Sequence, residues 1–255
     1  MRAFMERFVF DPAKSLFVGV EQEYFLTDYR GVIAPIALTV LKHLSNRGQF
    51  GYELSACQLE SRVGPFHVNS IEAELMRCNE LIESAEDTLG FGRSYREVGP
   101  FDMPLDIYPD PTGRYTRITK NMPSDILRAA CRVIGTHIHV GMPDHATALR
   151  VYNSVLAHYD ELCAMGDLSN GERLKIYKIM APDYQPGPYA SWDDFIHKAR
   201  EKGWDKDPRQ CWTLIRISIH GTIEFRMFGV TDDLSQVVKW VLRCHELCKN
   251  TIRLL

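Results

Sequence analysis

The 255-residue chain lacks several features that mark particular classes of protein. No apolar run approaches the roughly 18 residues that a membrane-spanning helix needs, so we expect no membrane partner. The N-terminal stretch MRAFMERFVFDPAKS lacks the uninterrupted apolar core of a signal peptide, because Glu6 and Arg7 interrupt it. There is no block of like charges, and the formal net charge is only −3. This balance does not favour nucleic acid as a partner.

Cysteine is present, but not in a disulfide or zinc pattern. The seven cysteines are scattered and include no C-x-x-C pair, which indicates reduced thiols in a cytoplasmic protein. We interpret Cys244 and Cys248, one helical turn apart, as two packed thiols. The absence of H-E-x-x-H also disfavours zinc. The chain has no internal repeat, and we expect a single domain over residues 1–255.

The hydrophobic pattern predicts helices mixed with strands. Strands are expected at about 16–27, in two extended pieces within 49–63, at about 131–142, and at 213–219 and 222–228 with a hairpin at His220-Gly221 between them. Helices are expected near 36–46, at 69–90, from Pro123 to about 130, at 144–165, near 170–180 and at about 234–253. Residues 94–120 and 181–192 are predicted to be long loops. Without a strict βαβ rhythm, this order predicts an α+β fold with a largely antiparallel sheet.

The clearest predicted helix is 69–90. Its apolar residues recur at spacings of three and four, namely Ile71, Leu75, Cys78, Ile82, Ala85 and Leu89. Asn69 or Ser70 can cap its start, and Gly90 can cap its end.

Three predicted strands share pairs of ionisable residues two positions apart. The pairs are Glu21 and Glu23 in VGVEQEYFLTD, His137 and His139 in GTHIHVG, and Glu224 and Arg226 in TIEFRMF. Residues two apart in a strand point to the same side. A solvated strand face also alternates, but it usually carries a mixed run of Lys, Thr, Ser and Gln. These pairs are instead good ligands for a metal or a phosphate.

Glu53 and Glu60, in YELSACQLESR, add two further carboxylates. Their separation of seven would place them on opposite faces of one straight strand, but a turn or bulge near Ser55-Ala56 can bring both to one side. Together with the strand pairs they predict a carboxylate-rich cavity that suits Mg²⁺, or Mn²⁺ in its place. Five carboxylates are too many for one ion that keeps its waters, so two or three ions are expected, arriving with nucleotide phosphates.

The order of these motifs resembles the carboxylate–amine ligases related to glutamate–cysteine ligase, in particular the bacterial type 2, YbdK-like group. The matching stretches are GVEQEYFLTD, YELSACQLESRVGP, GTHIHVGMPD and GTIEFRMFG, and the resemblance covers roughly residues 17–245. That group looks like a distant relative of glutamine synthetase. The resemblance implies a curved, largely antiparallel, open sheet, with metals on its concave side and helices on its convex side.

The resemblance also implies a reaction. It is an ATP- and Mg²⁺-dependent ligation in which a carboxylate attacks the γ-phosphate and becomes an acyl phosphate. An amine then displaces phosphate and forms an amide bond, of which a γ-glutamyl bond is one form. The implied partners are small carboxylate and amine substrates, amino acids among them, and a homo-oligomer is left open.

Carried over position by position, the resemblance implies individual roles. The metal ligands would be Glu21, Glu23, Glu53, Glu60, His137 and Glu224. His139 and Arg226 would contact the phosphates of ATP or of the acyl phosphate as catalytic residues. Arg173, in GERLKIY, would meet a substrate carboxylate or phosphate, and Arg114 and Arg117, in GRYTR, are weaker candidates for ATP binding. The alternative for these last three arginines is a place on the surface.

The chain departs from the family pattern in two places. Family members commonly continue with helical sequence after the E-x-R strand, so we expect a catalytic domain shortened at its C-terminus. Gly229 stands where the family often has an aspartate. Three other functions remain open: a guanidino-kinase-like phosphotransferase, a non-catalytic nucleotide-binding partner of another enzyme, and a metal-dependent hydrolase.

Overall fold

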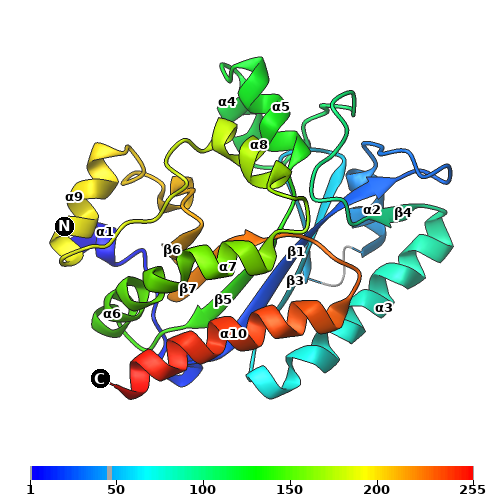
Figure 1. The fold of residues 1–255 in the computed structure, drawn as a ribbon. Coiled ribbons are helices and arrows are strands. Elements are labelled where there is room, and N and C mark those ends of the chain that lie inside the picture. Colours follow the sequence, from blue (N-terminus) through cyan, green and yellow to red (C-terminus); the bar gives the residue numbers. More distant parts are fainter. Residues whose placement is uncertain (1, 45–47, 255) are drawn as a thin grey trace.

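A single antiparallel sheet organises the computed structural model, which describes residues 2–44 and 48–254. The strands are β1 (Val18–Thr27), β2 (Phe50–Tyr52), β3 (Gln58–Phe66), β4 (Gly92–Ser94), β5 (Thr136–Gly141), β6 (Ile215–Ile217) and β7 (Thr222–Phe228). They pair in the order β2-β3-β1-β5-β7-β6, and β4 pairs with the end of β1. The sheet is open, with β2 and β6 at its two edges (Figure 1). The predicted α+β class with a largely antiparallel sheet is confirmed.

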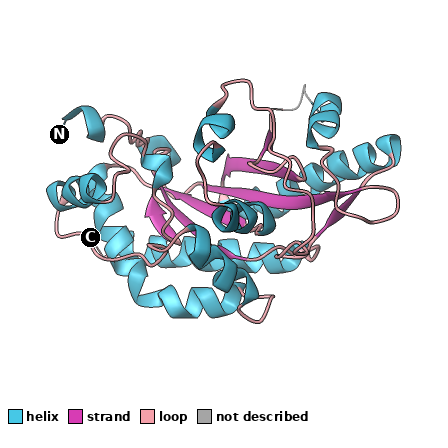
Figure 2. Ribbon diagram, turned by 90° about the horizontal axis from the view of Figure 1, so that it is seen from above, coloured by secondary structure: helices cyan, strands magenta, loops and turns pink. Residues whose placement is uncertain are grey.

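Long helices cover one face of this sheet. The helices are α1 (Arg2–Met5), α2 (Ala37–Leu44), α3 (Ile71–Leu89), α4 (Arg114–Thr119), α5 (Ser124–Arg132), α6 (His145–Val155), α7 (Tyr159–Gly166), α8 (Glu172–Met180), α9 (Trp192–Glu201) and α10 (Leu234–Arg253). Helices α3, α6, α7 and α10 pack against the strands and against one another, as Figures 1 and 2 show from two sides. None of the helices in the described ranges is both long and apolar enough to cross a membrane.

Strand alternation explains which residues reach the core. On β1 the buried side chains of Val18, Val20 and Tyr24 alternate with Gly19, Glu21 and Glu23, and only the second set is partly exposed. Ile138 on β5 and Phe225 on β7 belong to the same core as Val20. Because successive strand residues point to opposite faces, burying these apolar chains under the helices directs the ionisable pairs to the other face.

The predicted helix 69–90 agrees closely with α3. All of its predicted apolar positions are buried except Leu89, which is 37% exposed. Gly90 ends the helix with φ 68°, the left-handed conformation that glycine adopts readily. Ser70 stands at the start but makes no side-chain capping bond. Helix 36–46 corresponds to α2, which ends at Leu44, and residues 45–47 lie outside the described part of the chain.

Other predicted boundaries were wrong in identifiable ways. The loop 94–120 contains α4, which begins after Asp110 accepts backbone N–H bonds from Thr112, Arg114 and Tyr115. The helix 144–165 is two helices, α6 and α7, separated by a 3₁₀ turn at Leu156–His158. No helix was predicted between the loop 181–192 and the strand at 213–219, yet α9 occupies Trp192–Glu201.

Candidate functional site

The strand register places the ionisable residues next to one another across the sheet. In β1 and β5, Glu21 lies opposite His137. The other opposed pairs are Glu23 with Glu60, His139 with Glu224, and Glu224 with Arg216. Directly opposed residues in an antiparallel sheet have Cβ atoms about 5 Å apart. Pairing therefore brings together side chains that are as many as 116 positions apart in the sequence, as Glu21 and His137 are.

Glu53 joins this group because the chain reverses between β2 and β3. Residues 54–57 form the turn, and the backbone N–H of Gln58 donates to the carbonyl of Ser55 at 3.1 Å. The predicted turn near Ser55-Ala56 is thus present. Glu53 and Glu60 consequently line one cavity with the strand pairs.

This acidic cavity has a volume of about 210 Å³. Its charged and imidazole lining residues are Glu21, Glu23, Glu53, Glu60, Glu224, His137, His139, His220, Arg114, Arg209, Arg216 and Arg226. Every predicted metal ligand is therefore in one place. Tyr115 and Trp212 also line it.

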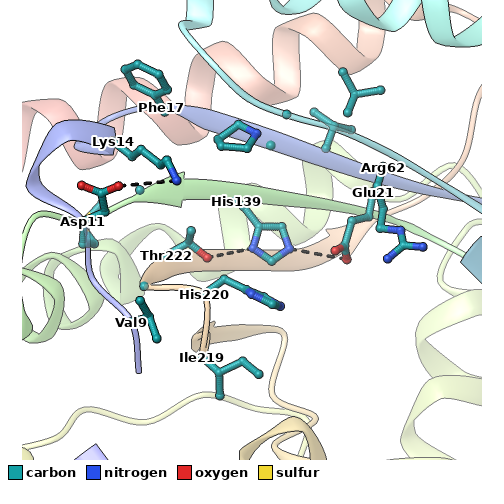
Figure 3. A pocket seen from close by; sticks show the side chains of 18 of the residues that line it. Val9, Asp11, Lys14, Phe17, Glu21, Arg62, His139, Ile219, His220 and Thr222 are labelled. Atoms are coloured by element: carbon teal, nitrogen blue, oxygen red, sulfur yellow. Dashed lines mark hydrogen bonds and ion pairs between the residues drawn. The ribbon is translucent and has the colours of Figure 1, made fainter. Parts of the chain in front are cut away.

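The two histidines both face Glu21 but differ in their other contacts. His137 Nδ1 lies 3.3 Å from Glu21 Oε2, and its Nε2 lies 3.8 Å from Glu23 Oε1. His139 Nε2 lies 3.5 Å from Glu21 Oε2, while its Nδ1 is 2.8 Å from Thr222 Oγ1 (Figure 3). His139 Nε2 is buried and makes no hydrogen bond to any of the described residues.

A compact set of three ligand atoms lies at the centre of the cavity. One ligand atom each from Glu21, His139 and Glu224 lies within 4.8 Å of the other two. The geometry thus groups His139 with the carboxylates, whereas the sequence motif suggested His137 for the metal and His139 for phosphate. His137 is instead next to Arg226, whose Nη1 is 3.5 Å from its Nδ1.

Two arginines hold Glu224, which is fully buried. Arg226 Nη1 donates to one carboxylate oxygen, and Arg216 Nε donates to the other at 2.6 Å. Although burial opposes ionisation, these two guanidinium groups hold the pKa of Glu224 well below its usual range. Sequence reasoning missed Arg216. The predicted hairpin around His220-Gly221 could have found it, because that hairpin sets Arg216 opposite Glu224.

The remaining carboxylates are electrostatically crowded. Burial, reinforced by the charges of Glu23 and Glu21, raises the pKa of Glu53 to about 8. Burial and the neighbouring glutamates likewise raise the pKa of Glu60, against the opposing charge of Arg62, which lies 3.0 Å away. By contrast, the adjacent histidines hold the pKa of Glu21 well below its usual range despite burial. A divalent cation would relieve this crowding.

The other predicted arginines occupy different surroundings. Arg114 lines the acidic cavity, but Arg117 is exposed and donates to the carbonyl of Thr112 at 2.8 Å. Arg173 is buried at the end of β5 and β7, where its guanidinium donates only to backbone carbonyls. Arg173 therefore does not line the cavity that it was predicted to serve.

A larger cavity of about 600 Å³ adjoins the acidic one and shares Glu21, His139, Ile219 and His220 with it. Its apolar lining includes Val20, Val63, Met142 and Ile219. The ion pair between Lys14 and Asp11 lies at the end away from Glu21 (Figure 3). The two cavities together form a polar centre with an apolar extension.

Curated relatives share this sequence at low identity. The chain is 28% identical over 157 residues to a protein of Rhodococcus jostii named "Putative glutamate--cysteine ligase 2-3". It is 25% identical over 227 residues to "Putative glutamate--cysteine ligase 2" of Bradyrhizobium diazoefficiens, and 24% identical over 252 residues to the protein of that name from Leifsonia xyli subsp. xyli. The chain is a relative of these glutamate–cysteine ligase 2 proteins. No family model matches the chain.

The alignments cover the relatives only in part. They span 61%, 82% and 87% of this chain, but 19%, 53% and 64% of the respective relatives. The chain thus spans less than two thirds of the length of each of these relatives.

The fold also has a counterpart among solved structures. A bifunctional glutathione synthetase from Pasteurella multocida superposes with a TM-score of 0.64 over 91% of this chain and 38% of that one, at 12% identity. This likeness concerns the fold alone.

Proposed function

We propose that this chain carries the catalytic site of an ATP- and Mg²⁺-dependent carboxylate–amine ligase, which forms an amide bond through an acyl phosphate. The observation that carries the proposal is the cluster of Glu21, His139 and Glu224, with Arg226 beside it. The similarity to proteins named as glutamate–cysteine ligases supports the same reaction class.

The acidic cavity fits divalent metal by the chemistry of its donors. Carboxylate oxygens with an imidazole nitrogen suit Mg²⁺ or Mn²⁺, and the buried His139 Nε2 makes no hydrogen bond within the described residues and faces Glu21 Oε2 at 3.5 Å. Glu21, His139 and Glu224 would hold one ion, and Glu23, Glu53 and Glu60, with His137 beside them, would hold further ions. Bound metal would neutralise the phosphates and polarise the transferring phosphoryl group.

Arg226 is suited to act on charge that develops during phosphoryl transfer. Its guanidinium is buried, and Nη1 is fixed by Glu224 while Nε has no partner. A fixed donor in a buried site needs little reorganisation, so it stabilises new charge more strongly than water does. Arg216 fixes Glu224 from the other side and so keeps the carboxylate in one orientation.

The two connected cavities would accommodate the two ends of a nucleotide. The triphosphate would lie at the acidic cavity, and the base would enter the larger cavity beside Ile219. Arg114, at the acidic cavity, would meet the carboxylate substrate or a phosphate.

A phosphate-release assay with ATP and Mg²⁺ tests the proposal against the other functions. Amino acids are supplied singly and in pairs, and guanidino compounds are supplied alone. Phosphate release that requires two substrates supports a ligase. ADP formed only with a guanidino compound indicates a kinase, and ATP binding without turnover indicates a non-catalytic partner. Glu21→Gln serves as the inactive variant, and Glu72→Gln, on the exposed face of α3, is the matched control.

A further inference from the structure

Arg173 is built into the end of the sheet behind the acidic cavity. It is 6% exposed, and its guanidinium makes three hydrogen bonds to backbone carbonyls. Nε donates to Ile134 at 2.7 Å, Nη1 to Met227 at 3.2 Å and Nη2 to Arg226 at 3.1 Å. One side chain from α8 thus ties the start of β5 to the end of β7.

The hydrogen bond to Ile134 lies one residue from a contact with Glu23. Ile134 precedes Gly135, whose backbone N–H donates to Glu23 Oε2 at 2.8 Å, while the Glu23 N–H donates to the Gly135 carbonyl at 3.1 Å. The fit is close, since a Cβ at Gly135 would stand 2.2 Å from Arg173 Nη2. Glycine is therefore needed there to let the guanidinium reach the strand end beside Glu23.

The bond from Arg173 Nη2 is made to the backbone of Arg226. Arg173 holds the backbone carbonyl of Arg226, whose side chain enters the acidic cavity and fixes Glu224. Ile134–Gly135 and Arg226–Met227 lie side by side at one end of the sheet, where β5 pairs with β7. A cation that binds both segments therefore fixes Glu23, which is bonded to Gly135, relative to Arg226.

Glu97 is a buried carboxyl group that lines a cavity together with Arg173. It accepts the Leu168 N–H at 3.0 Å through Oε1, and the shared cavity has a volume of about 190 Å³. A Cβ at Gly229 would lie only 1.5 Å from Glu97 Oε1. The Glu97 carboxylate thus occupies the space that a side chain at position 229 would need. It places a negative charge beside the buried guanidinium.

We propose that Arg173 is a positioning residue, which sets Glu23 and Arg226 for metal binding without contacting substrate. The inference rests on the proposed function, because it assigns metal to the acidic cavity. Residues that orient metal ligands in this way typically change metal affinity by about 10- to 100-fold when they are replaced.

Mn²⁺ binding to the metal-free protein tests the inference. Arg173→Lys keeps the charge but loses the planar fork. We expect it to weaken the Mn²⁺ Kd by about 10- to 100-fold, with KM for ATP within about threefold of wild type at saturating metal. Gly135→Ala is a second variant, which perturbs the same contact from the other partner and should weaken Mn²⁺ in the same range. Thermal unfolding shows whether each variant folds. The Mn²⁺ Kd of either folded variant is enough to test the positioning role.

Arg93→Lys is the matched control. Arg93 is also a buried arginine, but it pairs with Glu86 and lies outside the acidic cavity, so its replacement should lower the Tm without altering Mn²⁺ binding. An unchanged Mn²⁺ Kd in Arg173→Lys and Gly135→Ala, or a rise of more than 10-fold in KM at saturating metal, overturns the positioning role alone. A wild-type protein that binds no Mn²⁺ overturns the proposed function and the positioning role together.

Discussion

Replacing Glu53 with a residue that does not ionise should make the metal-free protein more stable at neutral pH. Burial and the charges of Glu23 and Glu21 raise the pKa of Glu53 from 4.5 to about 8. The folded state therefore keeps a proton that the unfolded chain has already lost. The stability contributed by this carboxyl is fully present below pH 4.5, and it is lost as the pH rises toward 8.

The size of the effect follows from the same values. This rise in the pKa of Glu53 corresponds to at most about 5 kcal/mol in the free energy of unfolding. Because Glu53 is only partly buried and interacts with Glu60, we expect about 2–3 kcal/mol to be observed. Glu60 and His139, whose pKa values are also raised, act in the same direction, whereas the lowered pKa values of His137 and His220 act in the opposite one.

A comparison of Glu53→Gln with wild type isolates the Glu53 contribution. Urea unfolding in EDTA at pH 5, 6, 7 and 8 gives the free energy of unfolding of each protein. The difference in favour of the variant should grow by about 2–3 kcal/mol between pH 5 and pH 8. Glu72→Gln, at an exposed site on α3, should show no such trend. A difference between Glu53→Gln and wild type that is constant with pH would refute the reasoning.

Three further changes separate the roles within the cavity. Arg226→Lys should lower kcat by about 10²-fold at saturating Mg²⁺; steady-state kinetics that show only a higher Mg²⁺ requirement would make Arg226 a structural partner of Glu224 instead. His139→Ala should weaken Mn²⁺ binding, measured by calorimetry, by more than about 10-fold and by more than His137→Ala does, because His139 belongs to the compact ligand set; the reverse order would contradict that grouping. Arg216→Gln should destabilise the protein by about 1–3 kcal/mol in urea unfolding, because it removes one of the two partners of buried Glu224; an unchanged midpoint would show that Arg226 alone suffices.

The sequence pattern was most informative where one physical rule applied. Residues two apart in a strand share a face, and this rule placed Glu21 with Glu23 and Glu224 with Arg226 before any register was known. The register itself depends on how strands pair, which the pattern does not state. It was therefore the structure that grouped His139, rather than His137, with Glu21 and Glu224.

Arginines were the hardest residues to place from the sequence. A long side chain with five donors serves equally well for a phosphate, a carboxylate or a row of carbonyls. Arg173 binds backbone carbonyls. Nothing in GERLKIY indicates this role rather than binding to a phosphate or a carboxylate. Arg216 lay in a predicted strand, but its importance appears only once β6 pairs with β7.

Some local elements were missed although their signals were present. Ser191 caps α9 by accepting the Asp194 N–H, and serine followed three residues later by an acidic residue is a sign of a helix start. Glu21 contacts both histidines, whereas Glu53 and Glu60 carry the unfavourable crowding.

Anomalous diffraction at the manganese edge, from crystals grown with Mn²⁺ and a non-hydrolysable ATP analogue, tests the central claim most directly. We predict at least two peaks within the acidic cavity, one of them bound by Glu21, His139 and Glu224, with the triphosphate between the ions and Arg226. Absence of manganese from the cavity in a crystal that contains bound nucleotide, or a nucleotide bound elsewhere, would contradict it.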